Sequence, residues 1–193
     1  MINEELMSKK RAIELWDLKI IDSIEVGSYK GLQQIHQYIF QDVFDFAGQT
    51  RNENMAKGYF RFASALYLED ILRKIELMPE NTFDEIIEKY VEMNIAHPFR
   101  EGNGRATRIW LNLILRNNLN RCIDWSKIDK YDYLNAMERS PINSLEIKHL
   151  LKNALTDKIY DRQVFMKGIQ KSYEYEGLKD YNIEDIDNEK DFR

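Results

Sequence analysis

The chain has 193 residues, 44% hydrophobic and 12% aromatic, which is enough apolar mass for one packed domain and argues against a disordered chain. Its formal net charge of −5 excludes the basic footprint that tight, nonspecific binding to nucleic acid requires. Cys122 is the only cysteine, no signal pattern opens the chain and no apolar stretch is long enough to span a bilayer, so we expect a cytoplasmic protein without nucleic-acid or membrane partners.

Long stretches without glycine or proline predict a mostly helical chain. The first apolar stripe at helical spacing runs through 31–46 and stops before Gly48, and the second runs through 64–77 and stops before Pro79. Glycine, asparagine and close-set aromatic residues interrupt the helical spacing at 49–62. We predict a short β-hairpin, or flap, in that interval.

The clearest predicted helix covers 82–97. Thr82 and Glu85 form a capping box at its start, and Pro98 ends it, because proline disfavours the helical conformation of the residue before it. After a turn that contains glycine, the next helix is predicted from about 104 to 117.

Three further helices are predicted at 129–139, 143–159 and 164–176. Gly177 follows the last of them as a C-terminal capping glycine. From residue 180 onward the chain is acidic and has no helical stripe, so we predict a loosely held tail. The predicted fold class is therefore all-α with one small β element.

The turn after the helix at 82–97 places three residues at a helix N-terminus: Gly102, Asn103 and Gly104. Unpaired backbone N–H groups and the helix dipole favour an anion there, and glycine lets the backbone approach it closely. Arg105 and Arg108 are three residues apart, so they project from nearly one face of the same helix. Two guanidinium groups beside a helix N-terminus predict a polyphosphate site.

Two more residues of this loop carry chemistry. His97 has an imidazole suited to taking a proton from an attacking hydroxyl near neutral pH. Glu101 offers a carboxylate oxygen next to the predicted phosphates, and Mg²⁺ is typically held by one or two carboxylates together with phosphate oxygens. Phosphoryl-type transfer needs mainly positioning and charge neutralisation, which this loop supplies.

The loop matches the Fic motif at every defining position, with His97-x-Phe99-x-Glu101-Gly102-Asn103-Gly104-Arg105-x-x-Arg108. The chain thus resembles the Fic family. The resemblance implies a Fic-type helical domain and a protein adenylyltransferase, which moves AMP from ATP to a Ser, Thr or Tyr hydroxyl and releases pyrophosphate.

The resemblance also implies a role for each residue of the loop. His97 is the base, Glu101 the Mg²⁺ ligand and Asn103 an α-phosphate contact. Arg105 and Arg108 contact the β- and γ-phosphates of ATP. Phe99, within the same motif, anchors the loop in the core.

Outside the loop, 35–48 is similar to the family's amino-terminal signature, and Lys57 with Gly58 to its flap. In the family the flap pairs with an extended segment of the target, which implies a target protein docked along it. Lys57 and Gly58 are also candidate ATP contacts. His36 lies on an apolar stripe and is interpreted as a core histidine, and His149 receives no role.

Glu176 falls in the last turn of the predicted helix at 164–176, where the helix dipole disfavours a carboxylate by ~0.3–1 kcal/mol unless a cation offsets it. The segment Ser172-Tyr173-Glu174-Tyr175-Glu176-Gly177 resembles the Fic inhibitory motif, Ser/Thr-x-x-x-Glu-Gly/Asn, in the subgroup that carries it at the carboxyl terminus. The resemblance implies that Glu176 pairs with Arg108 in place of the ATP γ-phosphate. Tyr173 lies in the same helix, which motivates the hypothesis that its self-modification releases the helix.

Two alternatives remain open. The scaffold could transfer another phosphate-linked group or remove AMP, with Glu176 orienting a water molecule, or it could be a non-catalytic binding module gated by nucleotide. The resemblance also implies a homo-oligomer as an inactive form. We expect a Fic catalytic domain at 1–163 with its core at about 25–160, an autoinhibitory helix at 164–179 and an acidic tail at 180–193.

Overall fold

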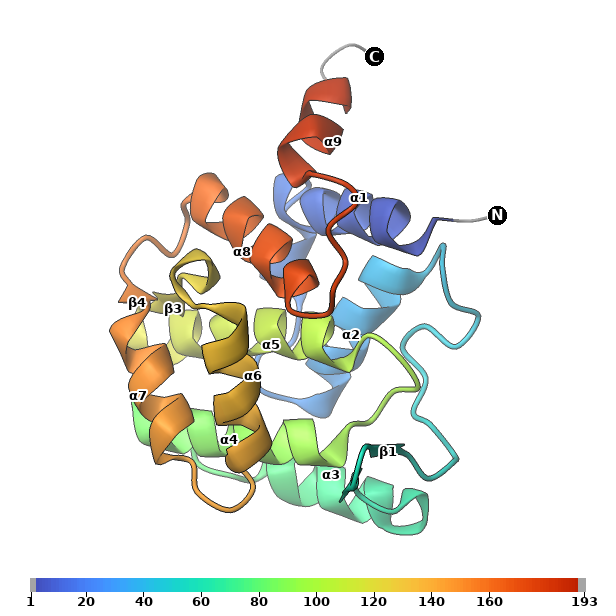
Figure 1. Ribbon diagram of the computed structural model, residues 1–193, viewed down its shortest axis with the longest axis vertical. Coiled ribbons are helices and arrows are strands. Elements are labelled where there is room, and N and C mark those ends of the chain that lie inside the picture. Colours follow the sequence, from blue (N-terminus) through green and yellow to red (C-terminus); the bar gives the residue numbers. More distant parts are fainter. Residues whose placement is uncertain (1–2, 191–193) are drawn as a thin grey trace.

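Helices make up most of the described chain, residues 3–190 of the computed structural model (Figure 1). In chain order they are α1 (Glu4–Asp17), α2 (Tyr29–Phe40), α3 (Leu68–Glu76), α4 (Phe83–Ala96), α5 (Asn103–Leu119), α6 (Lys130–Arg139), α7 (Leu145–Asn153), α8 (Arg162–Glu174) and α9 (Ile183–Lys190). Short 3₁₀ turns occur at Ile20–Ser23, Ala65–Tyr67 and Trp125–Lys127.

Two antiparallel strand pairs complete the fold. β1 (Ala56–Lys57) pairs with β2 (Phe60–Arg61), and β3 (Cys122–Ile123) pairs with β4 (Leu155–Thr156). The first pair is a hairpin, the predicted flap. The second pair joins distant segments and was not predicted. The all-α prediction with a small β element is confirmed.

Helix α5 forms the centre of the molecule and contacts α2, α4 and α8 (Figure 1). An apolar stripe of α5 is buried along its length, at Ala106, Ile109, Trp110, Leu113 and Ile114. Burying one side chain of this size stabilises the fold by about 1.5–3 kcal/mol, so the stripe fixes how α5 lies. The residues at the start of α5 are positioned by this packing.

Two predicted helices are shorter than the apolar spacing indicates. The helix predicted at 31–46 ends at Phe40, because the Phe44 ring stacks on Phe46, with ring centroids 4.7 Å apart, and packs on Phe40 around a turn. The helix predicted at 143–159 ends at Asn153. Beyond it the chain becomes β4, whose partner strand is held in part by the Asp124 N–H donating to the Ala154 carbonyl.

The prediction of a loosely held tail from residue 180 is wrong for α9. Ile183 and Ile186 are buried, and α9 packs against α1 and α8. Two apolar residues three apart make too short a stripe to stand out in an acidic sequence. The last three residues of the predicted tail, 191–193, lie outside the described residues.

Helix α1 was not predicted, and it carries the core further toward the N-terminus than the expected limit of about 25. The Asn3 side chain caps it by accepting from the Leu6 N–H at 2.9 Å, and Ala12, Ile13 and Leu15 are fully buried. In Figure 1, α1 and α9 lie next to each other at one end of the molecule, where they contact.

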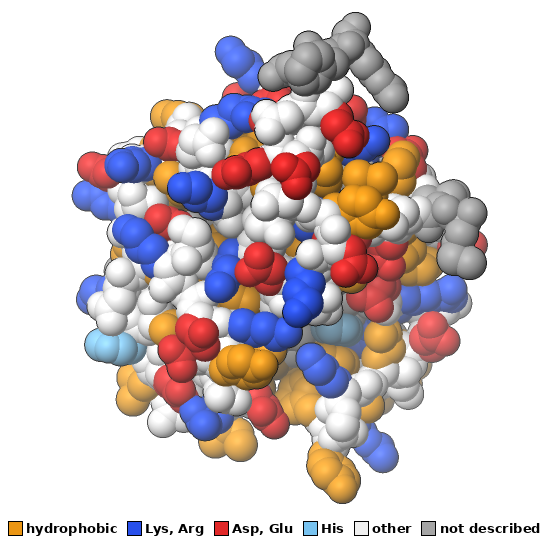
Figure 2. Space-filling view, turned by 45° about the horizontal axis from the view of Figure 1, so that its top comes forward, with side chains coloured by type: hydrophobic (Ala, Val, Ile, Leu, Met, Phe, Trp, Pro, Cys, Tyr) orange, Lys and Arg blue, Asp and Glu red, His pale blue; other side chains and the backbone are white. Residues whose placement is uncertain are grey.

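Charged side chains are mixed on the face that Figure 2 shows, with Lys and Arg interleaved with Asp and Glu. Within residues 3–190, none of the helices combines the length and the apolarity that crossing a bilayer requires.

Candidate active site

In the loop that joins α4 to α5, a residue with positive φ stands at each end. The Thr82–Glu85 capping box starts α4, as predicted. His97 follows the last residue of α4 as its C-cap and adopts a left-handed conformation with φ of 49°. Gly102, with φ of 78°, precedes α5. A Cβ on Gly102 would lie 2.5 Å from the Phe40 ring, so only glycine allows this turn to pack there.

Asn103 closes the turn with its side-chain amide. Its Oδ1 accepts from the Phe99 N–H at 2.9 Å, and its Nδ2 donates to the Phe99 carbonyl at 2.7 Å. The Phe99 ring is fully buried, in the core position that the sequence indicates. An amide nitrogen has two hydrogens, so Asn103 keeps one donor for a further acceptor.

His36 packs against the loop as a buried core histidine, as interpreted from the sequence. Its ring stacks on Phe99 with centroids 3.8 Å apart. Its Nδ1 accepts from the Gly48 N–H at 2.9 Å, so Nε2 carries the proton and donates to the Glu101 carbonyl at 2.8 Å. Burial lowers the pKa of His36 to about 4.

His97 is partly buried, and its imidazole stacks on Phe62 with centroids 3.7 Å apart and planes 11° apart. Burial, together with the charges of Arg51 and Lys57, lowers the pKa of His97 to about 4. The imidazole is therefore neutral at pH 7, the form that can accept a proton. Lys57 acts on His97 from β1, so the flap contributes to the electrostatics of the loop.

Glu176 lies against both arginines of the loop. Its Oε1 is 3.1 Å from Nη2 of Arg108, and its Oε2 is 2.6 Å from Nε of Arg105, an ion pair whose alignment is not that of a hydrogen bond. Arg105 and Arg108 are only 2% and 4% exposed. A Cβ on Gly104 would lie 2.6 Å from the Glu176 carboxylate, so glycine makes room for this carboxylate at the start of α5.

Ser172 holds Arg108 from the side of α8. Its Oγ accepts from Arg108 Nε at 2.7 Å, and its carbonyl accepts from Arg108 Nη2 at 2.9 Å. After α8 the chain turns back at Gly177, which has φ of 80°, and the N–H groups of Gly177 and Leu178 donate to the carbonyls of Glu174 and Tyr173. This capping turn, with glycine where the sequence indicates it, aims Glu176 at the arginines.

Tyr173 does not reach solvent in this arrangement. It is 1% exposed, and its hydroxyl donates to Ser8 Oγ at 2.8 Å. Burial raises the pKa of Tyr173 to about 12. Self-modification at Tyr173 therefore requires α8 to leave its place first.

Glu101 is 59% exposed at the edge of the loop, with Oε1 3.1 Å from the Gly102 N–H and 3.4 Å from Arg105 Nη2. The described residues include no cluster of three or more His, Cys, Asp and Glu side chains that could hold a metal. One exposed carboxylate beside an anion site fits a Mg²⁺ ion that takes its other ligands from phosphates and water.

Lys57 and Gly58 lie at the exposed end of the flap. A Cβ on Gly58 would meet no atom within 4 Å, so its φ of 59° explains the glycine. The loop itself makes no contact there that would fix either residue as an ATP contact, so that assignment stays a prediction.

Three residues without any signal in the sequence also contact the loop or its arginines. Glu4 lies on α1, and its Oε1 is 2.8 Å from Arg105 Nη1. Tyr133 lies on α6, and its hydroxyl oxygen accepts from Arg108 Nη1 at 3.4 Å. Arg51 precedes the flap and donates to the loop carbonyls. None of the three belongs to a repeated pattern or a local motif.

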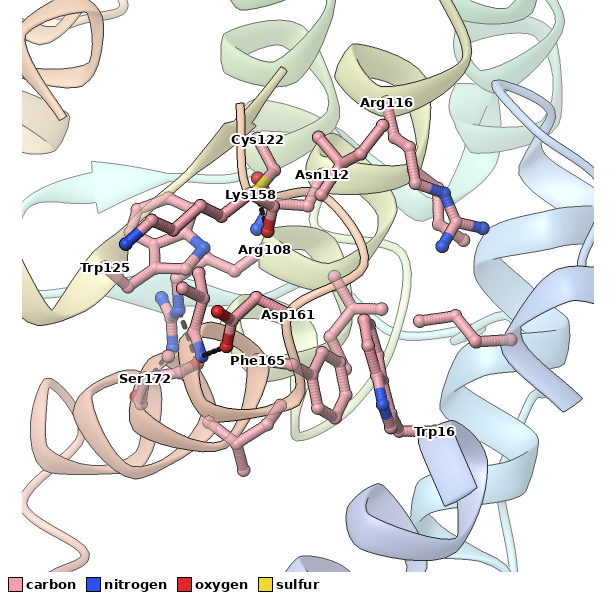
Figure 3. A pocket seen from close by; sticks show the side chains of 17 residues that line it. Trp16, Arg108, Asn112, Arg116, Cys122, Trp125, Lys158, Asp161, Phe165 and Ser172 are labelled. Atoms are coloured by element: carbon pink, nitrogen blue, oxygen red, sulfur yellow. Dashed lines mark hydrogen bonds between the residues drawn. The ribbon is translucent and has the colours of Figure 1, made fainter. Parts of the chain in front are cut away.

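A cavity of about 50 Å³ lies behind Arg108 and Ser172, between α5 and α8 (Figure 3). Its walls are mostly apolar and include Trp16, Trp125 and Phe165, and Gly168 of α8 also lines it. Figure 3 shows the hydrogen bonds between Arg108 and Ser172 at one edge of this space. Gly168 therefore places the inner side of α8 against this space.

Fold and site together define an all-α protein with an anion site at a helix N-terminus, next to a neutral histidine. A family profile described as Fic/DOC matches residues 27–115, which includes α2 to α4 and most of α5. The probable protein adenylyltransferase y4lH of Sinorhizobium fredii is 33% identical over 150 residues, 71% of this chain and 74% of that protein. The chain belongs to the Fic/DOC family.

Other relatives agree with this assignment. The protein adenylyltransferase VbhT of Bartonella schoenbuchensis is 30% identical over 168 residues, 80% of this chain. The chain spans about a third of VbhT, with 34% of its length covered. The crystal structure of BepC from Bartonella tribocorum, with bound AMPPNP, has the same fold at a TM-score of 0.65 and 20% identity, covering 78% of this chain and 83% of that one.

Proposed function

We propose that this chain is a protein adenylyltransferase, which transfers AMP from ATP to a Ser, Thr or Tyr hydroxyl of a target protein and releases pyrophosphate. We further propose that Glu176 holds it inactive by competing with the ATP γ-phosphate for Arg108. The observation that carries the proposal is the Glu176 carboxylate bound to both loop arginines at the start of α5. Family membership and the names of the relatives support the reaction class.

The loop residues account for the reaction as follows. The target hydroxyl attacks the α-phosphorus of ATP, its proton passes to the neutral imidazole of His97, and pyrophosphate leaves. The N–H groups at the start of α5, with Arg105 and Arg108, neutralise the phosphate charge. Asn103 has one amide hydrogen left for the α-phosphate. Glu101 would hold Mg²⁺, which when bound adds further charge neutralisation.

Burial of the arginines explains why a carboxylate can act as the inhibitor. Removing one partner from a buried ion pair leaves an uncompensated charge and typically costs about 3–5 kcal/mol. Arg105 and Arg108 are buried, and Arg105 also pairs with Glu4 and Glu101. Glu176, in contrast, is the carboxylate that pairs with Arg108 among the described residues, so Arg108 in particular is stabilised by an anion. Glu176 supplies it in the resting state, and the phosphates of ATP supply it in the active state.

The same contacts weigh against the two alternatives. Both carboxylate oxygens of Glu176 face a guanidinium, which favours competition with phosphate over the activation of water for AMP removal. A binding module has no need of a base, and the pKa of His97 is lowered by burial so that the imidazole stays neutral near pH 7. We propose that the target docks along the flap, where Tyr59 and Phe60 are exposed large hydrophobic residues.

The experiment compares wild type, Glu176→Gln and Glu176→Gln/His97→Ala in α-labelled ATP, Mg²⁺ and bacterial lysate. Weak labelling by wild type, strong labelling by Glu176→Gln and none by the double variant are expected. The matched control is Glu174→Gln, because Glu174 lies two residues from Glu176 but pairs with Lys171, at 3.8 Å, and with neither arginine of the loop. It should behave as wild type.

Two results would contradict the proposal at different points. Equal labelling by wild type and Glu176→Gln would remove the inhibitory role of Glu176. Labelling that survives His97→Ala in the Glu176→Gln background would remove His97 as the base.

A further inference from the structure

Arg51, in the segment between α2 and the flap, is 3% exposed although it carries a charge. Its guanidinium donates to four backbone carbonyls: His97 at 2.6 Å, Glu53 at 2.6 Å, Ala63 at 2.6 Å and Ala96 at 3.0 Å. Its own backbone N–H donates to the Pro98 carbonyl at 2.8 Å. No carboxylate among the described residues lies close enough to form an ion pair with it. Backbone oxygens accept the hydrogen bonds of its guanidinium, and the Glu53 carboxylate adds a longer-range attraction.

Three of these carbonyls belong to consecutive residues, Ala96, His97 and Pro98. They lie at the end of α4, where helix carbonyls lack intrahelical partners and the dipole favours a positive charge. His97 is held there in the left-handed conformation, which a residue other than glycine keeps only when its surroundings fix it. Arg51 supplies such contacts on both sides of the His97 peptide groups.

The other two carbonyls lie at the two ends of the flap. Glu53 precedes β1 and Ala63 follows β2, so one guanidinium joins both ends of the hairpin to the turn at His97. Phe62, next to Ala63, stacks on the His97 ring. The position of the flap relative to the imidazole is therefore set through Arg51.

We propose that Arg51 is a positioning residue, which sets the distance and direction between the His97 imidazole and the flap so that a hydroxyl held along the flap meets the base. The proposal rests on the proposed function, because it takes His97 as the base and the flap as the docking edge. Lysine cannot replace the fork, because one ammonium group cannot reach carbonyls on both sides.

The charges that face His97 give a readout independent of activity. Arg51 faces it from the segment before β1 and Lys57 from β1, while Phe62 covers the ring without charge. Burial and these two charges keep the pKa of His97 near 4. Removing the Arg51 charge should raise the pKa of His97, whereas keeping the charge as lysine should leave it low.

The experiment titrates the three histidines by NMR in Arg51→Met, Arg51→Lys and Lys89→Met. Lys89 is the matched control, because it is a buried cation like Arg51. It lies on α4 and binds Glu80 and the Glu76 carbonyl, which precede the N-terminal end of α4, whereas His97 follows its C-terminal end. We expect the pKa of His97 to rise in Arg51→Met alone. His36 reports the fold, and its pKa should stay near 4 in every folded variant.

Kinetics in the Glu176→Gln background complete the test. Arg51→Lys should lower kcat for the target by about tenfold to a hundredfold and leave the KM for ATP within about twofold, because a misplaced base affects the transfer and not nucleotide binding. Lys89→Met should change neither the kcat for the target nor the KM for ATP.

The possible outcomes separate the proposals. If Arg51→Met does not fold, His36 and His97 titrate together near the ordinary histidine value, and Arg51→Lys decides. An unchanged kcat in Arg51→Lys, or an unchanged His97 titration in folded Arg51→Met, overturns the positioning role. Transfer that survives His97→Ala overturns the proposed function, whatever the titration of Arg51→Met shows.

Discussion

At the scale of single residues, each loop arginine lies between two aromatic rings. The Arg105 guanidinium is 4.8 Å from the Phe40 ring and 5.2 Å from the Tyr173 ring. Arg108 is 5.6 Å from the Tyr133 ring and 5.3 Å from the Tyr175 ring. In both cases one ring belongs to α8 or its capping turn. Helix α8 and its capping turn thus provide each arginine with a ring as well as a shared carboxylate.

Gly104→Ala should uncouple Glu176 from the loop. The added Cβ would lie 2.6 Å from the Glu176 carboxylate and 2.8 Å from Arg108 Nη1, so the ion pair must move. Alanine favours the helix by about 1 kcal/mol over glycine, which keeps α5 intact. In a double-mutant cycle with Glu176→Gln, we expect Glu176→Gln to raise AMP transfer at least about tenfold alone and by less than about twofold on the alanine background. Equal gains on both backgrounds would show that the carboxylate does not depend on Gly104.

His36 contributes to the pH dependence of stability, as does His97, whose pKa is also lowered to about 4. The pKa of His36 is about 4 in the folded chain against an ordinary value of 6.5, so the unfolded chain binds the proton more readily. The free energy of unfolding should therefore fall as the pH drops from 6.5 toward 4, by up to about 3 kcal/mol at about 1.4 kcal/mol per pKa unit. Above pH 6.5 this histidine contributes no slope.

Urea denaturation of wild type and His36→Gln at pH 7 and pH 5 measures this contribution. The difference in unfolding free energy between the two proteins should be smaller at pH 5, because the variant has no imidazole to protonate at position 36. A difference that is the same at both pH values contradicts the assignment.

At the scale of elements, α8 is held at one end by its capping turn and left with a cavity along its inner side. Ser172 and Glu176 fix its C-terminal end to the loop. Gly168 lies in the middle of the helix, beside the cavity, where glycine costs about 0.5–1 kcal/mol relative to alanine. Gly168 therefore lowers the intrinsic helix stability of α8.

Gly168→Ala should strengthen autoinhibition. Its Cβ would lie 3.4 Å from Trp125 Cδ1, an ordinary contact, and would partly fill the cavity. A gain of about 0.5–1 kcal/mol corresponds to about a two- to fivefold drop in basal AMP transfer, together with a higher Tm. On the Glu176→Gln background the rise in Tm should remain, and the transfer rate should not change. A drop in rate on that background would mean that alanine disturbs the catalytic loop itself.

The predictability of each element followed from the strength of its local signal. The helix at 82–97 and the loop after it were predictable, because a capping box, a proline and a dense motif mark them in the sequence. The end of α2, the β3–β4 pair and α9 depend on contacts with distant segments, which spacing along the chain does not contain. Arg51 illustrates the same limit within the site, since its four acceptors come from residues 53 to 97 and no pattern joins them.

At the scale of the whole molecule, α1 and α9 hold α8 between them. Lys9 of α1 is fully buried and donates to Glu5 at 2.7 Å, to the Tyr181 carbonyl at 2.6 Å and to Gln170 of α8 at 3.3 Å. Arg162 of α8 also bridges carboxylates of α1 and α9. The Fic/DOC profile matches residues 27–115, so these contacts lie outside the residues that the profile matches.

Lys9→Met should weaken the packing of α8 on the domain and leave the loop between α4 and α5 unchanged. The substitution leaves the Glu5 carboxylate buried without its cation, a change that typically costs about 3–5 kcal/mol. Because α1, α8 and α9 meet at Lys9, the loss should fall on α8 and α9 more than on α4 and α5. We expect hydrogen exchange to rise in 162–190 and to stay low in 103–119, and basal AMP transfer to rise toward the level of Glu176→Gln. Lys10→Met, next to it and less buried, is the control and should change neither. Faster exchange spread evenly over all helices would instead show that Lys9 stabilises the domain as a whole, and that α1 and α9 do not control α8 separately.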